Sequence, residues 1–81
     1  MDIKKITLEA LVEITGLPLE DLADNMSLRL RDEGILDSLS CAALATELQE
    51  RIGRKFKSSK MVITDFETID SIIEAVKRNM K

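Results

Sequence analysis

The chain has 81 residues, 44% of them hydrophobic, and a formal net charge of −3. This composition predicts one small globular domain over residues 1–81, and the acidic balance argues against nucleic-acid binding, because phosphates require a basic surface. The chain has no histidine, so histidine acid–base catalysis, Ser–His triads and imidazole metal sites are excluded.

Signals for a membrane or an oxidising compartment are also missing from the sequence. No apolar run approaches the length of a membrane span, and Met1 and Asp2 do not begin a signal peptide, so we expect no membrane insertion. The single cysteine cannot form an internal disulfide, which favours a reducing compartment. We therefore expect a cytoplasmic protein, and we expect it to be a monomer.

Residues 2–15 have the pattern of an amphipathic helix. Apolar residues recur there at spacings of three and four, while Glu9 and Glu13 fall mostly on the other side. Asp2 suits the N-cap and Gly16 the C-terminal stop. A carboxylate pair at this spacing can serve acid–base chemistry inside a cleft, but we interpret Glu9 and Glu13 as part of a solvated face.

A long connection follows over residues 17–36. Its start can hold a single turn of helix, with Pro18 at an early position. Residues 28–31, Leu-Arg-Leu-Arg, alternate as an extended segment does, with leucines inward and arginines outward. A connection of this length is usually functional in a compact domain. Its apolar residues should anchor it to the rest of the fold: Met26, Leu28, Leu30, Ile35 and Leu36.

A second long helix is predicted from Ser38 to about Gly53. Cys41 lies one turn beyond Ser38, and with no histidine or second cysteine to activate it we interpret it as a packing thiol and not a nucleophile. The buried stripe of this helix is expected to contain Leu39, Leu44, Ala45, Leu48 and Ile52. The partly outward residues are expected to be Ala42, Ala43, Thr46, Glu47 and Glu50.

A basic cluster and a last helix complete the chain. The cluster consists of Arg51, Arg54, Lys55, Lys57 and Lys60, and its charge suits either the C-terminus of a helix or a partner surface. The apolar residues that should cap the bundle, around at most one short helix, are Phe56, Met61, Val62, Ile63 and Phe66. Thr68 is the predicted N-cap of the last helix. The apolar positions of that helix are Ile69, Ile72, Ile73, Val76 and Met80, and its far end carries Lys77, Arg78 and Lys81.

These elements predict an all-α fold. We expect a small four-helix bundle of three longer helices and one short helix, with a long loop between the first and second long helices. The core must be aliphatic, because Phe56 and Phe66 are the only aromatic residues. Leu48 and Ile72, which lie in the two clearest helical stripes, should be buried.

The stretch Glu-Gly-Ile-Leu-Asp-Ser-Leu-Ser at residues 33–40 is the strongest functional signal. Gly34 interrupts what precedes it, and Asp37 and Ser38 then open the second long helix. A hydroxyl at such a position is accessible and lies near free N–H groups and the positive end of a helix dipole, which suits a phosphate ester. The chain supplies no base, metal cluster or phosphate loop, so we expect no enzyme activity and no catalytic or metal-binding residues.

This stretch resembles the attachment motif of the acyl and peptidyl carrier proteins, Asp-Ser-Leu after a Gly-containing loop, and the resemblance extends from about Ile3 to Val76. In that family the serine oxygen receives 4′-phosphopantetheine from coenzyme A, and the terminal thiol of this arm carries an acyl or aminoacyl group as a thioester. The resemblance implies covalent 4′-phosphopantetheine on Ser38, with Asp37 and Leu39 helping to dock the phosphopantetheinyl transferase. The other implied partners are a ligase that activates the cargo and a downstream acyltransferase or synthase.

The motif is closer to specialised carriers than to the fatty-acid-synthesis type. In that type acidic residues follow the serine, whereas residues 40–43 here are Ser-Cys-Ala-Ala. The loop is also similar to the Gly-Leu-Leu-Asp-Ser of stand-alone D-alanyl and other aminoacyl carrier proteins. We therefore expect a role in a specialised lipid or secondary-metabolite pathway, with a cargo that the sequence does not name.

One alternative remains open at this point. The chain can instead be a non-enzymatic helical adaptor that binds a protein through its loop, with Ser38 only a helix cap. If Ser38 is a cap, its replacement by alanine should cost about 0.5–2 kcal/mol of stability.

Overall fold

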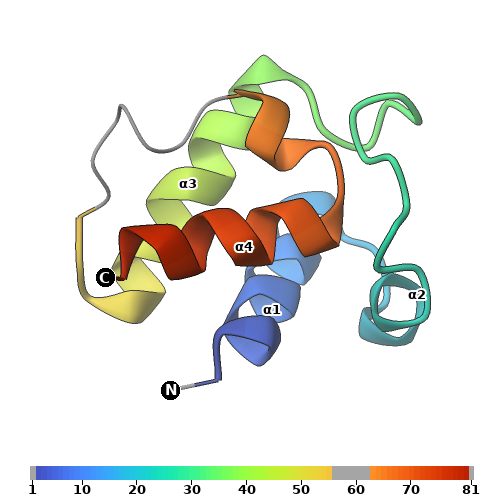
Figure 1. The fold of residues 1–81 in the computed structure, drawn as a ribbon. Coiled ribbons are helices and arrows are strands. Elements are labelled where there is room, and N and C mark those ends of the chain that lie inside the picture. Colours follow the sequence, from blue (N-terminus) through green and yellow to red (C-terminus); the bar gives the residue numbers. More distant parts are fainter. Residues whose placement is uncertain (1, 56–62, 81) are drawn as a thin grey trace.

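The computed structural model describes residues 2–55 and 63–80, in which every regular element is a helix. The predicted all-α bundle is confirmed, and Figure 1 shows α4 crossing α3 and α1, with α2 at one side. Several predicted core and basic residues lie outside the described residues: Phe56, Lys57, Lys60, Met61, Val62 and Lys81. The elements are α1 (Ile3–Thr15), α2 (Leu19–Ala23), α3 (Ser38–Ile52), the 3₁₀ helix η2 (Ile63–Phe66) and α4 (Ile69–Asn79).

The ends of α1 and α3 follow from capping residues in the sequence. The Asp2 carboxylate accepts from the Lys5 N–H at 3.1 Å, as predicted for an N-cap. Gly16 and Gly53 end these helices with φ of 74° and 79°, a left-handed conformation that costs glycine little. Both helices therefore begin and end close to where the sequence predicts.

The core is aliphatic and joins all four α-helices. α1 packs against α3 and α4, and α2 packs against α1. Leu48 and Ile72 are fully buried, as predicted, and Phe66 of η2 is also buried. The largest fully buried side chains include Leu11, Leu22, Leu30, Leu44, Leu48, Ile69, Ile72 and Val76.

The connection before α3 is tied to the start of α4. The Leu30 N–H donates to the Glu67 carbonyl oxygen at 2.7 Å, and the Asp70 N–H donates to the Met26 carbonyl oxygen at 3.1 Å. These bonds span a large separation along the chain, and the burial of Leu30 and Leu36 adds to them. The loop that leads to Ser38 is therefore anchored to the bundle at Met26, Leu30 and Leu36.

The extended segment predicted over residues 28–31 is only partly correct. Leu30 is buried and both neighbouring arginines are exposed, as the alternation predicted. From Leu30 onward, however, the backbone turns, because the N–H groups of Ile35 and Leu36 both donate to the Leu30 carbonyl oxygen, at 2.8 and 3.0 Å. The prediction was wrong there because the sequence does not show this local hydrogen bonding.

Candidate functional site

Ser38 is the first residue of α3, and its side chain is exposed. Its hydroxyl makes no hydrogen bond to the part of the chain that the structure describes. The N-cap is the preceding residue, since the Asp37 carboxylate accepts from the Ser40 N–H at 2.8 Å. The interpretation of Ser38 as the helix cap is therefore wrong, and the hydroxyl remains available for another role.

The first turn of α3 stabilises the charged form of the Asp37 carboxylate. The hydrogen bond from the Ser40 N–H, with a further contribution from the Ser40 hydroxyl, lowers the pKa of the Asp37 carboxyl below its ordinary value. Asp37 is exposed, so at neutral pH it is an ionised carboxylate next to the Ser38 hydroxyl. The carboxylate thus accepts a hydrogen bond from the helix terminus and is otherwise exposed to solvent.

Leu39 lies on the outside of α3, which corrects the prediction that it belongs to the buried stripe. Its side chain is 83% exposed, whereas Leu44 and Leu48 are fully buried. Leu39 lies five residues before Leu44, which rotates it about 140° around the helix from that stripe. Ala42 and Ala43, one turn further along, are also exposed, so Ser38 is bordered by a small apolar surface with no carboxylate on it.

Cys41 lies on the opposite face of the same turn. It is a free cysteine, 4% exposed, and packs in the core. Burial raises the pKa of the Cys41 thiol above 9.0, and the positive charge of Arg31 opposes this shift only in part. A buried thiol of this kind is protonated at neutral pH, which confirms the interpretation of Cys41 as a packing residue.

Arg31 is a residue near the site that the sequence interpretation treated only as part of an outward-facing alternation. The turn over residues 30–36 folds the segment that carries Arg31 back toward the residues that lead into α3. Its positive charge lowers the pKa of Cys41, in the first turn of that helix. Its exposed side chain makes no hydrogen bond or ion pair with residues 2–55 or 63–80. In the sequence Arg31 is only a basic residue seven positions before Ser38. Its relation to Ser38 can be inferred only when the turn over residues 30–36 is known.

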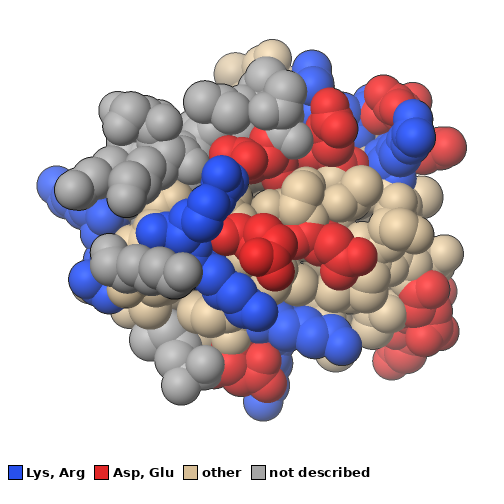
Figure 2. All heavy atoms as spheres, in the orientation of Figure 1, with Lys and Arg blue, Asp and Glu red and all other residues tan. Residues whose placement is uncertain are grey.

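Two residues of the basic cluster, Arg51 and Arg54, bind groups of the protein itself, and Arg54 does so at a helix terminus. Arg51 pairs with Glu47 at 2.7 Å, and Arg54 donates to the carbonyl oxygen of Met80, the C-cap of α4, at 3.1 Å. Figure 2 shows lysine and arginine side chains on the side where α3 ends and also across the middle of this face, with acidic side chains at its centre and toward α2.

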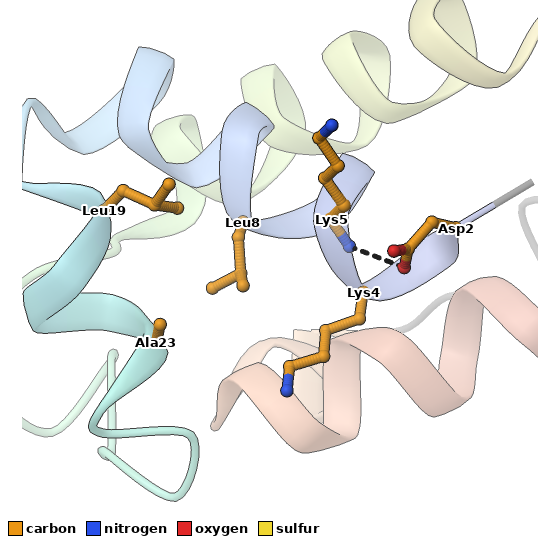
Figure 3. Close-up of a pocket in the computed structure, with 6 residues that line it drawn as sticks. All are labelled: Asp2, Lys4, Lys5, Leu8, Leu19 and Ala23. Carbon is orange, nitrogen blue, oxygen red and sulfur yellow. Dashed lines mark hydrogen bonds between the residues drawn. The ribbon is translucent and has the colours of Figure 1, made fainter.

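A pocket of about 420 Å³ lies between the start of α1 and α2. In Figure 3, Leu8, Leu19 and Ala23 face the space between the two helices, while Lys4 and Lys5 diverge on the α1 side. None of its lining residues belongs to residues 33–40, so it is separate from the candidate attachment site.

Two further kinds of site can be assessed for the described part of the chain. In residues 2–55 and 63–80, no group of three or more acidic, cysteine or histidine side chains is placed to hold a metal ion. Across the same residues, no helix is long and apolar enough to cross a membrane.

Comparison with known proteins agrees with the geometry of α3. Residues 6–76 match the model of the family described as phosphopantetheine attachment site. D-alanyl carrier protein 2 of Lactiplantibacillus plantarum is 37% identical over 75 residues, which cover 93% of this chain and 90% of that protein. The D-alanyl carrier proteins of Lactobacillus delbrueckii subsp. bulgaricus and Streptococcus sanguinis are 35% and 34% identical, over 96% and 94% of this chain and 94% and 92% of their own lengths. No solved structure matches the chain.

Proposed function

Because the chain belongs to the phosphopantetheine-attachment family of carrier proteins, we propose that Ser38 bears its covalent 4′-phosphopantetheine arm and that the cargo is an aminoacyl group, D-alanine. The family is one of carriers and not of enzymes, and covalent 4′-phosphopantetheine is its cofactor. The attachment residue, the cargo and its delivery to partner enzymes are the content of the proposal.

The observation that carries the proposal is the exposed hydroxyl of Ser38 at the start of α3, which makes no hydrogen bond to the described residues. An attachment oxygen must be reachable by a transferase and must not be held in a hydrogen bond that the reaction has to break. Asp37 satisfies the terminus of the helix, so Ser38 can be modified without removing a cap. The site therefore fits a phosphate ester at this oxygen.

The chain cannot supply the carrying thiol itself. Its only cysteine, Cys41, is buried in the core with a raised pKa. When bound, 4′-phosphopantetheine supplies an accessible thiol that forms a thioester with the cargo. The contribution of the protein is to hold the attachment oxygen at a fixed position on the surface, at the end of a helix that is packed against α1.

Two neighbours of Ser38 have roles in recognition under this proposal. Leu39 is exposed and offers the transferase an apolar contact, while Asp37 offers an ionised carboxylate. Ala42 and Ala43 add no negative charge to this surface, which suits a dedicated ligase and a downstream acyltransferase better than partners that select acidic carriers. We propose that the chain acts as a single carrier domain over residues 1–81, as a monomer in the cytoplasm.

Modification followed by loading tests the proposal. The chain is incubated with coenzyme A and a phosphopantetheinyl transferase, and then with a D-alanine-activating ligase and ATP, and intact mass is measured after each step. Wild type and the control Ser27→Ala should gain one arm and then one hydroxylamine-labile D-alanyl group, and Ser38→Ala should gain neither. Modification of Ser38→Ala would overturn the choice of residue, and loading with a fatty acyl group in preference to D-alanine would overturn the cargo.

A further inference from the structure

Arg31 precedes Ser38 by seven positions in the chain, but a turn folds its segment back toward the start of α3. The carbonyl oxygen of Leu30, in the peptide group that joins Leu30 to Arg31, accepts from the N–H groups of Ile35 and Leu36. This turn brings the peptide group that precedes Arg31 into hydrogen-bonding contact with Leu36, two positions before Ser38. The long side chain of Arg31 therefore starts from a point on the chain that is folded back toward the start of α3.

The side chain of Arg31 has no partner in the described residues. The neighbouring Arg29, by contrast, pairs with Asp32 at 3.5 Å. Arg31 is exposed, yet its charge acts on the first turn of α3, where it lowers the pKa of Cys41 against the larger effect of burial. Among residues 2–55 and 63–80, therefore, no carboxylate forms an ion pair with this arginine.

A phosphodiester on Ser38 would supply a counter-ion. It would add a negative charge next to the ionised Asp37 carboxylate, whose own hydrogen bond goes to the Ser40 N–H. Two adjacent anions repel each other, and a guanidinium nearby offsets this repulsion. Arginine is also the side chain whose planar donors best match phosphate oxygens.

We propose that Arg31 binds the phosphate of the arm on Ser38 and thereby holds the first part of that arm against the turn over residues 30–36. This inference rests on the proposed function, because it requires the arm to be on Ser38. It assigns Arg31 as a positioning residue that touches the cofactor and does not touch the cargo. Since the pair is exposed, it should be weakened by salt.

The test compares the unmodified and modified forms of the full chain by NMR. Wild-type protein, labelled with ¹⁵N, is converted by the transferase, and intact mass and peptide mapping establish that one arm is on Ser38. The side-chain Nε–H resonance of Arg31 should then shift on modification, and the shift should shrink as sodium chloride is raised. The Nε–H resonance of Arg29 should stay in place and serves as the internal control.

Matched variants provide a second readout that does not depend on loading. The ³¹P resonance of the modified protein should move in Arg31→Gln and should keep its wild-type position in Arg29→Gln. An arm on Ser38 with no shift at Arg31, or an equal ³¹P change in both variants, would overturn this inference and leave the proposed function intact. An arm found on another residue, or no arm at all, would overturn both.

Discussion

The N-terminal turns of α3 and α4 are built from similar residues but differ in how much of them the rest of the protein covers. Each begins after a polar cap, and each has a serine three residues later whose N–H is bound by that cap: Asp37 with Ser40, and Thr68 with Ser71. Local sequence therefore makes two helix starts of nearly equal design. Their surroundings differ: the start of α4 is packed against neighbouring segments, whereas the start of α3 is exposed on its outer face.

The start of α4 is packed and hydrogen-bonded to neighbouring segments, although Glu67 and Asp70 are exposed. The Ser71 hydroxyl accepts from the Thr68 N–H at 3.0 Å and donates toward the carbonyl oxygens of Asp65 and Thr68, at 2.7 and 2.9 Å. Ile69, the first residue of α4, is fully buried. The Asp70 N–H is bound by the Met26 carbonyl oxygen of the long loop. Polar groups of this turn are therefore hydrogen-bonded to neighbouring segments of the chain.

The start of α3 keeps its outer face free. Asp37 caps one N–H, the Ser38 hydroxyl has no hydrogen bond to residues 2–55 or 63–80, and Leu39 is 83% exposed. Only the inner side of the turn, at Cys41, is packed into the core. The comparison teaches that a serine at a helix start is suited to modification when its surroundings leave it unused.

The largest expected difference between the two turns concerns their apolar residues. Ile69→Ala should lower the free energy of unfolding by about 2–5 kcal/mol, because it removes a fully buried side chain and leaves a cavity. Leu39→Ala should change it by less than about 0.5 kcal/mol, since the side chain already faces solvent. Urea unfolding of both variants measures this, and similar losses would contradict the assignment of Leu39 to the surface.

Replacing Ser71 should likewise lower the free energy of unfolding more than replacing Ser38, but by a smaller difference than for the apolar residues. Ser71→Ala removes a hydroxyl on which several backbone groups depend, and should destabilise the protein by about 1–3 kcal/mol. Ser38→Ala removes a hydroxyl that makes no hydrogen bond within the described part of the chain, and should stay within about 0.5 kcal/mol of wild type. If thermal and urea unfolding showed Ser38→Ala to be the more damaging change, Ser38 would be structural after all.

The two caps should respond differently to acid, which is the smallest of these effects. The pKa of Asp37 is lowered in the folded state by its bond from Ser40, so the cap contributes fully above the unfolded value of 3.8 and is lost as pH falls through the lowered folded pKa. The Thr68 hydroxyl does not titrate. Between about pH 6 and about pH 2 the backbone N–H resonance of Ser40 should therefore follow the titration of Asp37, and that of Ser71 should not.

Asp37→Asn is the control for this titration. Asparagine caps a helix about as well as aspartate but has no charge to lose, so the Ser40 resonance should become insensitive to acid. A Ser40 resonance that titrates equally in wild type and Asp37→Asn would mean that another carboxylate is responsible.

The sequence was sufficient for features that depend on neighbouring residues. The caps Asp2 and Thr68, the stops Gly16 and Gly53 and the buried stripe of α4 all follow from local spacing and chemistry, and the structure confirms them. The motif around Ser38 identified the family for the same reason, since it is a short continuous stretch that the comparisons confirm.

The features that were wrong or missed depend on contacts that a linear pattern does not contain. Leu39 was assigned to the apolar stripe from its spacing in the sequence, but its position around the α3 axis directs its side chain away from the core. The turn at Leu30 depends on its bonds to Ile35, Leu36 and the distant Glu67, so the position of Arg31 could not be inferred from its place in the chain. In each case tertiary packing decided between conformations that local preference allowed.

The account depends most directly on Ser38 bearing the arm, and peptide mapping of the modified protein tests this. The chain has six serines, so mapping has to distinguish Ser38 from five other possible attachment residues. After treatment with coenzyme A and a phosphopantetheinyl transferase, tandem mass spectrometry should place a single phosphopantetheine on Ser38, and none on Ser40 or Ser71. A modification on any other serine, or an exposed Ser38 that accepts no arm, would contradict the account.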